Sequence, residues 1–140
     1  MGAASSRYAA ASDGPDAAAA RAICRVRNDY ELAVRASKHL ESLLTLEPVS
    51  AVGNGLNEKL DHALLAQSVE LSDAVVKSVR LVVGFRNRLV HEVAVTCLPD
   101  RPKFLAAFAS ADSALRASRQ RRRAASTPHA QATPASCVVM

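Results

Sequence analysis

The chain has 140 residues, a formal net charge of +5 at pH 7 and an apolar content of 49%. Only 4% of the residues are aromatic and tryptophan is absent, so the core must be built mainly from Ala, Val and Leu, which favours packed helices over a sheet. No apolar run approaches the roughly 20 residues that cross a bilayer. The first residues also lack the continuous apolar segment of a secretory signal.

The three cysteines, Cys24, Cys97 and Cys137, are odd in number, widely spaced and form no C-x-x-C pair. This pattern argues against a disulfide framework and against a zinc site, and it fits a reducing, cytoplasmic compartment. We therefore expect neither a metal nor a cofactor. The Ala- and Ser-rich start also has the composition of an organelle transit peptide, but Asp13 and Asp16 argue against that interpretation.

The positive charge is concentrated near the C-terminal end of the sequence. A cluster of five arginines equals the whole net charge of +5, and no acidic residue follows Asp112. The members of this arginine cluster are Arg116, Arg119, Arg121, Arg122 and Arg123. The rest of the chain is neutral, so the high net charge does not predict a nucleic-acid-binding surface on the folded domain itself.

The N-terminal segment, residues 1–27, is Ala-rich and of low complexity, and we expect disorder over residues 1–20 unless the Ala run extends the first helix. Asn28, followed three residues later by Glu31, predicts a helix start of the capping-box type. Apolar side chains then recur at helical spacing as far as residue 46, and Pro48 ends this helix.

Three further helices are predicted. A Gly-containing loop leads to a short helix over residues 56–69, and Ser72 caps a long helix over residues 73–93. Asp100 and Pro102 open the last helix, which is expected to fray where the arginine cluster begins.

The predicted fold class is therefore all-α. We expect a small antiparallel four-helix bundle over residues 28–118, followed by a basic tail over residues 119–140 that is rich in Pro, Ser and Thr.

A polar stripe runs along the long third helix when its residues are projected at 100° per residue. Its members are Asp73, Lys77, Arg80, Gly84, Asn87, Arg88 and His91. Asn87 and His91 are four residues apart, so their side chains can meet. Arg86 breaks the pattern because it projects among Val75, Val79, Val82, Leu89 and Val93, where an arginine is costly unless it is paired or reaches the surface.

Two interpretations of the segment FRNRLVHE, residues 85–92, require no function. Cations near a helix C-terminus complement the helix macrodipole, and Arg86 could extend its charged group to the surface. Alternatively, Arg86 pairs with an acid in the core, so that its replacement by Ala would strand a buried carboxylate and destabilise the fold. An arginine and a histidine five residues apart are weak evidence for a site when taken alone.

The surrounding residues strengthen that evidence. The segment VGFRNRLVHE, late in a long central helix, resembles the signature of the HEPN superfamily (higher eukaryotes and prokaryotes nucleotide-binding domains). The segments DYELAVRASKHLESLL and GLNEKL resemble the opening helices of a compact bacterial branch, and the resemblance covers about residues 28–118. Many members are metal-independent ribonucleases in which the Arg and His of two subunits line a shared cleft, and cleavage leaves a 2′,3′-cyclic phosphate.

By this resemblance, Arg86 and His91 are the catalytic residues, Asn87 assists them, and Arg88 either contacts phosphate or stays solvated. The residue types suit the chemistry, because His exchanges protons near neutral pH and Arg offers a permanently charged fork to the phosphorane. Asn87, one turn before His91, can orient the imidazole or bind a phosphate oxygen. A dimer cleft would also explain an arginine on the apolar arc.

The sequence departs from one branch of the superfamily. HepT-like toxins carry a Tyr two residues after the His, where a partner enzyme attaches nucleotides, whereas this chain has Val93. Control by tyrosine modification, and a paired nucleotidyltransferase, are therefore not supported. Other members bind RNA or nucleotide without cutting it. His39, His62 and His129 have no clustered ligands, and we interpret them as surface or linker residues.

Both ends of the sequence match lipidation patterns. Cys137 begins a C-a-a-X box that ends in Met140, and the arginine cluster before it supplies the second signal that a single lipid needs. In a eukaryote we expect farnesylation of Cys137; in a bacterium the match means nothing. Gly2 fits the myristoylation pattern, although Ala-rich starts produce this match easily. If the arginine cluster is not such a second signal, it is either a solvated helix end or a tail that binds along the RNA backbone.

We therefore expect a HEPN-type homodimer that cuts or binds RNA, with Arg86, Asn87 and His91 in its site. Its expected partners are RNA, a second copy of the chain and, through Cys137 and the arginine cluster, the cytoplasmic face of a membrane. The alternative is a catalytically silent helical dimer, an adaptor that binds RNA, nucleotide or protein at a membrane surface.

Overall fold

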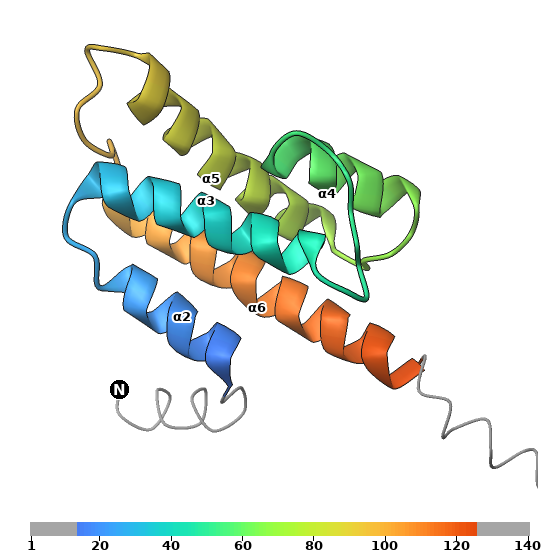
Figure 1. The fold of residues 1–140 in the computed structure, drawn as a ribbon. Helices are drawn as coiled ribbons and strands as arrows, with labels where there is room; N and C mark the ends of the chain where they lie inside the picture. Colours follow the sequence, from blue (N-terminus) through green and yellow to red (C-terminus); the bar gives the residue numbers. More distant parts are fainter. Residues whose placement is uncertain (1–13, 126–140) are drawn as a thin grey trace, which may run out of the picture.

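The computed structural model describes residues 14–125, which form five α-helices and no strand. In chain order the helices are α2 (Pro15–Cys24), α3 (Asp29–Thr45), α4 (Leu56–Leu65), α5 (Asp73–His91) and α6 (Arg101–Ala125). Figure 1 shows that α3, α5 and α6 alternate in direction, with α2 along one side and α4 at one end. The all-α prediction is confirmed, with five helices rather than four in the described part of the chain.

The helix starts are made by the polar side chains that the sequence indicated. The Asn28 side chain accepts a hydrogen bond of 2.8 Å from the Glu31 N–H, and Ser72 accepts one of 3.3 Å from the Val75 N–H. Asp100 does the same for Lys103 at the start of α6, at 3.1 Å. Each bond satisfies a backbone donor that has no partner within its own helix.

Two helix ends differ from the prediction. Helix α4 ends at Leu65, and the backbone of Gln67 then takes a left-handed φ of 56°, which stops the helix before residue 69. Helix α5 ends at His91, and Val93 beyond it is 96% exposed. The placement of Val93 on the apolar arc of α5 was therefore wrong.

Helix α2 lies where disorder was expected, so that expectation was wrong for residues 15–20. Pro15 occupies the first turn, where its missing N–H is no loss, and the alanines that follow are strong helix formers. Ala17, Ala20 and Ile23 are buried, and α2 packs against both α3 and α6. Small alanine side chains permit this close approach, so the helix is held by packing without a stripe of large apolar residues.

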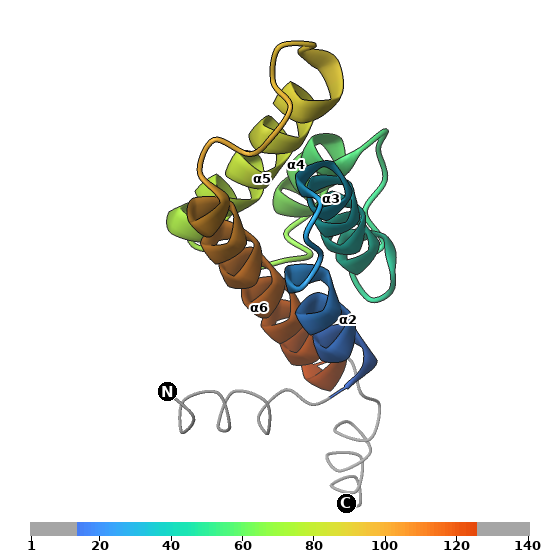
Figure 2. The same ribbon diagram turned by 90° about the vertical axis from the view of Figure 1, so that its left-hand side faces the viewer.

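The hydrophobic core lies mainly between α3, α5 and α6 (Figure 2), which all contact one another. Its largest fully buried apolar side chains are Phe104, Phe108, Leu32, Leu40, Leu43, Leu44, Leu60, Leu115, Val79 and Val82. Phe85 of α5 packs edge-on against Phe104 of α6, with ring centroids 6.0 Å apart. None of the described helices is both long and apolar enough to span a membrane.

Replacing Phe108 by Ala should lower the free energy of unfolding by about 3–5 kcal/mol, because Phe108 has no exposed surface and its removal leaves a cavity. Chemical denaturation followed by circular dichroism measures the loss. Leu65→Ala is the matched control, since Leu65 is 86% exposed and its loss should change stability by less than about 0.5 kcal/mol. Equal effects of the two substitutions would contradict the assignment of the core.

Candidate functional site

The polar stripe predicted for α5 is present. Asp73, Lys77, Arg80, Gly84, Asn87, Arg88 and His91 are all exposed, while Val79, Val82, Val83 and Leu89 are buried on the other side of the helix. The last turns of α5 therefore present one amide, one imidazole and one guanidinium from this stripe to solvent.

Arg86 lies between the stripe and the buried face of α5. Its side chain is half-buried, and its Nη1 donates a hydrogen bond of 3.1 Å to the Asn87 side-chain oxygen. No carboxylate within residues 14–125 forms an ion pair with Arg86. The interpretation in which Arg86 pairs with an acid in the core is therefore wrong.

The Arg86–Asn87 pair opens into a groove of about 350 Å³ between α3, the start of α4 and α5. Helix α3 contributes Ser37 and Lys38 to the lining. The Ser37 hydroxyl is buried and has no hydrogen-bond partner among the described residues. The groove thus combines two cationic side chains with neutral polar groups.

Two carboxylates also line this groove, and each has a partner. Glu41 accepts a hydrogen bond of 2.7 Å from the Lys59 ammonium, and Glu58 accepts one of 3.0 Å from the Asn54 N–H. Both carboxylates are therefore already hydrogen-bonded on the α4 side of the groove. Arg86 reaches the groove from α5 without such a carboxylate partner.

His91 is the last residue of α5, and its exposed imidazole makes no hydrogen bond or ion pair with any other described residue. It shares the polar stripe with Asn87, one turn earlier. Arg86 lies five residues before it, which on an α-helix places the two side chains about 140° apart around the axis. One copy of the chain therefore does not bring Arg86 and His91 together.

Arg88 lies beside the predicted site and forms an exposed ion pair with Glu92. Its Nε is 3.8 Å from a carboxylate oxygen of Glu92, and both side chains are about half exposed. Ion pairs of this kind are screened by water and contribute little to stability. Arg88 is thus available to an incoming phosphate at low energetic cost.

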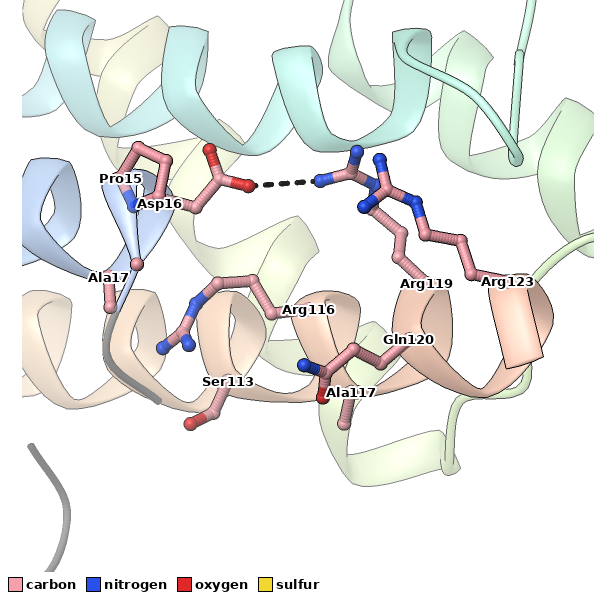
Figure 3. A pocket seen from close by; sticks show the side chains of 10 residues that line it. Pro15, Asp16, Ala17, Ser113, Arg116, Ala117, Arg119, Gln120 and Arg123 are labelled. Carbon is pink, nitrogen blue, oxygen red and sulfur yellow. Dashed lines mark hydrogen bonds and ion pairs between the residues drawn. The ribbon is translucent and has the colours of Figure 1, made fainter. Parts of the chain in front are cut away.

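The arginine cluster does not form a frayed helix end. Helix α6 remains regular to Ala125, so the predicted fraying was wrong within the described residues. Arg119 is only 7% exposed: its Nη1 donates to Asp16 at 3.1 Å, and its Nη2 donates to the Glu47 backbone oxygen at 3.1 Å. Figure 3 shows this pairing of Arg119 with the start of α2. Arg119 therefore joins three segments of the chain.

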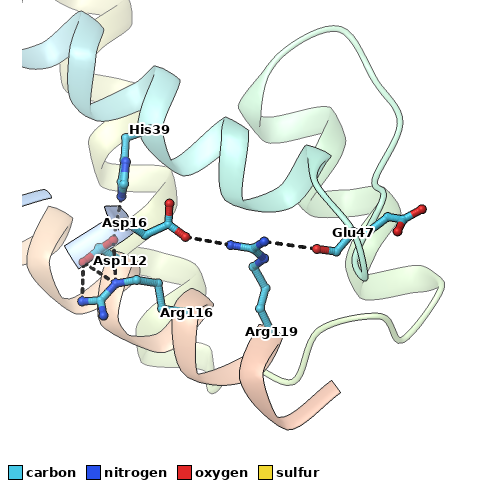
Figure 4. Close-up of polar contacts among 6 residues, drawn as sticks. All are labelled: Asp16, His39, Glu47, Asp112, Arg116 and Arg119. Atoms are coloured by element: carbon cyan, nitrogen blue, oxygen red, sulfur yellow. Dashed lines mark hydrogen bonds and ion pairs between the residues drawn. The ribbon is translucent and has the colours of Figure 1, made fainter. Parts of the chain in front are cut away.

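A buried polar network crosses the interface between α3 and α6 (Figure 4). Asp112 is 1% exposed, and its Oδ1 lies 2.8 Å from the His39 Nε2. Arg116, one turn further along α6, donates to the same carboxylate through Nη2 at 2.8 Å and through Nε. The interpretation of His39 as a surface residue was wrong, since its side chain is 8% exposed and packs edge-on against Phe108.

The electrostatics of Asp112 show how the network is balanced. Burial opposes its ionisation and is the largest single influence, but the hydrogen bonds from His39 and Arg116, together with their charges, bring the pKa of Asp112 below its ordinary value. A signal for this residue was present in the sequence, because Asp112 follows Phe108 by four residues on the apolar face of α6. His39 is 73 positions away, so no local pattern could connect the two.

The remaining candidate residues fall into two groups. Gly2, Cys137 and His129 lie outside the described residues. Cys97 is exposed, while Cys24 is half-buried, and burial, with a smaller contribution from the Asp112 charge, raises the pKa of its thiol. Residues 14–125 contain no cluster of three or more His, Cys, Asp or Glu side chains that could bind a metal ion.

In comparisons with known proteins, no protein family, curated protein or solved structure matches this chain.

Asp112→Asn should lower the free energy of unfolding by about 3 kcal/mol, because it removes a buried charge that pairs with the partly buried Arg116 side chain. The native protein should also lose stability as the pH falls below about 4, the ordinary pKa of an unfolded Asp, since its folded pKa is lower. Denaturation at several pH values measures both effects.

The variant should show a shallower loss of stability below that pH than the native protein. Asp61→Asn is the control, since Asp61 forms only an exposed ion pair with Arg80 and should change stability by less than about 1 kcal/mol. An identical pH dependence in the native protein and the Asp112 variant would contradict the assigned ionisation.

Proposed function

We propose that this chain is a metal-independent endoribonuclease of the HEPN type, acting as a homodimer through Arg86, Asn87 and His91. The observation that supports it most is Arg86: a half-buried arginine at the edge of the buried face of α5, with an amide partner and no carboxylate partner among the described residues. A guanidinium in this state retains its charge for a phosphate ligand. Neither a stable salt bridge nor a fully solvated position accounts for it.

The proposed reaction is transesterification at an RNA phosphodiester. His91 acts as base and removes the proton of the ribose 2′-hydroxyl while the 2′-oxygen attacks the adjacent phosphorus. The new O2′–P bond replaces the P–O5′ bond, and the leaving 5′-oxygen takes a proton from water. Arg86 stabilises the charge on the phosphorane. The products are a 2′,3′-cyclic phosphate and a 5′-hydroxyl end.

The homodimer is part of this proposal because a single copy separates the two catalytic side chains around α5. Pairing the ends of two α5 helices would bring Arg86 of one copy toward His91 of the other. Val93, which is 96% exposed directly after this helix, would lose water-accessible apolar surface in such a contact. The proposal is supported by the all-α packing of α3 to α6, since a HEPN-type subunit is expected to be a small helical bundle.

Purified protein incubated with a mixed RNA pool in EDTA should generate fragments that end in 2′,3′-cyclic phosphate. His91→Ala should lower the cleavage rate by about 10²–10⁴-fold, the usual contribution of a general acid–base group. Arg86→Ala should lower it by about 10²–10³-fold, as for other groups that stabilise transition-state charge. Gel analysis with end-group detection by mass spectrometry measures the products.

Lys77→Ala is the control, because Lys77 lies on the same polar stripe of α5, exposed and away from the proposed site. It should leave cleavage unchanged, and circular dichroism should show that all three variants remain folded. RNA binding without cleavage by the native protein would reject the enzyme and favour the catalytically silent adaptor. If the native protein showed neither RNA cleavage nor RNA binding, both the ribonuclease and an RNA-binding adaptor would be rejected.

Mixing the two inactive variants provides a separate prediction. If each site takes Arg86 from one copy and His91 from the other, a heterodimer of Arg86→Ala and His91→Ala contains one intact site and should regain up to about half of the native activity. Co-expression with two affinity tags isolates the mixed dimer. A site built within one copy would instead leave the mixed dimer as inactive as each parent.

A further inference from the structure

The groove beside Arg86 has room for more than a phosphate group. Its volume of about 350 Å³ lies within the range of about 300–1,000 Å³ that is usual for small-molecule sites. Helix α3 forms one side of it, α5 forms another, and the first residues of α4 with the loop before them form the end. The groove can therefore hold a nucleobase in addition to the phosphate that Arg86 would bind.

Two cations of this groove have hydrogen-bond donors that no described residue uses. Arg86 donates through Nη1 to Asn87, but its Nε and Nη2 make no hydrogen bond within residues 14–125. Neither nitrogen is among the buried atoms that lack a partner, so both are in contact with solvent. Lys38 is exposed on α3, and its ammonium has no hydrogen bond or ion pair to another described residue. These donors are available to the oxygens of a phosphate group.

The carboxylates of the groove do not cancel this charge. Glu41 forms its ion pair with Lys59, at 2.7 Å, and Glu58 is the other acid of the lining. Counting Lys59 with Lys38 and Arg86, three cations face two carboxylates, so one positive charge remains. No side chain caps the start of α4, and its first N–H groups add partial positive charge at the same end of the groove.

The rest of the groove wall is neutral. Val34, which is half-buried on α3, supplies apolar surface together with the smaller exposed parts of Leu56 and Val83. The side-chain oxygens of Asn57 and Asn87 each accept a hydrogen bond from an arginine, which leaves both NH₂ groups free to donate. A nucleobase has the matching chemistry, because its faces are apolar and its edges carry acceptor oxygens and nitrogens.

We propose that this groove binds the base of one nucleotide of the RNA substrate, with the adjoining phosphate at Arg86 and Lys38. The inference deepens the proposed function and rests on it for the identity of the ligand. A base that lies in a groove between helices cannot at the same time be paired and stacked in a duplex. The substrate is therefore single-stranded RNA or an unpaired loop, and duplex RNA is not a substrate.

The first test is fluorescence anisotropy of the whole chain with a labelled single-stranded RNA hexamer whose ribose 2′-oxygens are all methylated. The methyl groups block the attacking oxygen, so binding is measured without cleavage. We expect saturable binding of the hexamer. An abasic strand with the same backbone, and a duplex of the same sequence, should each bind at least tenfold more weakly. Equally tight binding of either one, or no binding of the hexamer, would overturn the inference.

Matched substitutions test the two parts of the groove. Val34→Trp fills the space for the base and Lys38→Gln removes a charge from the phosphate position, and each should weaken hexamer binding about tenfold. Asn54→Trp, at an exposed loop position on the same groove, is a second filling variant should Val34→Trp fail to fold. Ala106→Trp and Lys103→Gln are the controls, since both residues are exposed on α6 and lie outside the groove. Filling variants that remain folded and bind like the native protein would overturn the inference.

Binding and cleavage together separate this inference from the proposed function. Groove-dependent binding of the methylated hexamer, without cleavage of ordinary RNA by the native protein, would reject the ribonuclease and support the base site. Cleavage of ordinary RNA that is equally fast in stems and loops, and unaffected by the filling variants, would support the ribonuclease and overturn the base site.

Discussion

The ionised side chain of Asp112, buried between α3 and α6, is the group around which the described helices are arranged. A carboxylate with 1% of its surface exposed is tolerated only because His39 and Arg116 bind both of its oxygens. His39 comes from α3 and Arg116 from α6, so the ionisation of Asp112 requires these helices to be in register. Apolar packing alone allows helices to slide, whereas a buried charge with two partners permits one arrangement.

Other charged side chains of α6 also fix neighbouring segments of the chain through polar contacts. Arg116 completes the Asp112 network. Arg119, three residues further along α6, donates hydrogen bonds to the Asp16 carboxylate of α2 and to the backbone oxygen of Glu47. The five arginines that make the sequence basic therefore do not act together as one surface charge. Arg116 belongs to the buried network, whereas Arg119 attaches α2 and the connection after α3 to α6.

The parts of the fold that could be predicted from the sequence are local ones. Asn28 and Ser72 cap helices because their side chains reach backbone donors three residues away, and such spacings are visible in the chain. The polar stripe of α5 follows from helix geometry alone. By contrast, the alanines of α2 show no periodic pattern of large apolar residues that would predict a buried helix face. The burial of α2 depends on α6, which is far away in the sequence. The pairing of His39 with Asp112 is likewise a product of tertiary structure.

For the candidate site, the sequence could indicate that Arg86 is anomalous, but only the structure shows that no core acid within the described residues pairs with it.

The position of the candidate site at the end of α5 has a consequence for how this chain can diversify. His91 and Asn87 are exposed, and neither has a contact with the core network around Asp112. Substitutions there are nearly free of folding penalties, whereas substitutions around Asp112 are not. Selection can therefore alter the side chains at the helix end, and with them the proposed chemistry, while the scaffold stays unchanged. Descendants of one such chain would share a core and differ in activity.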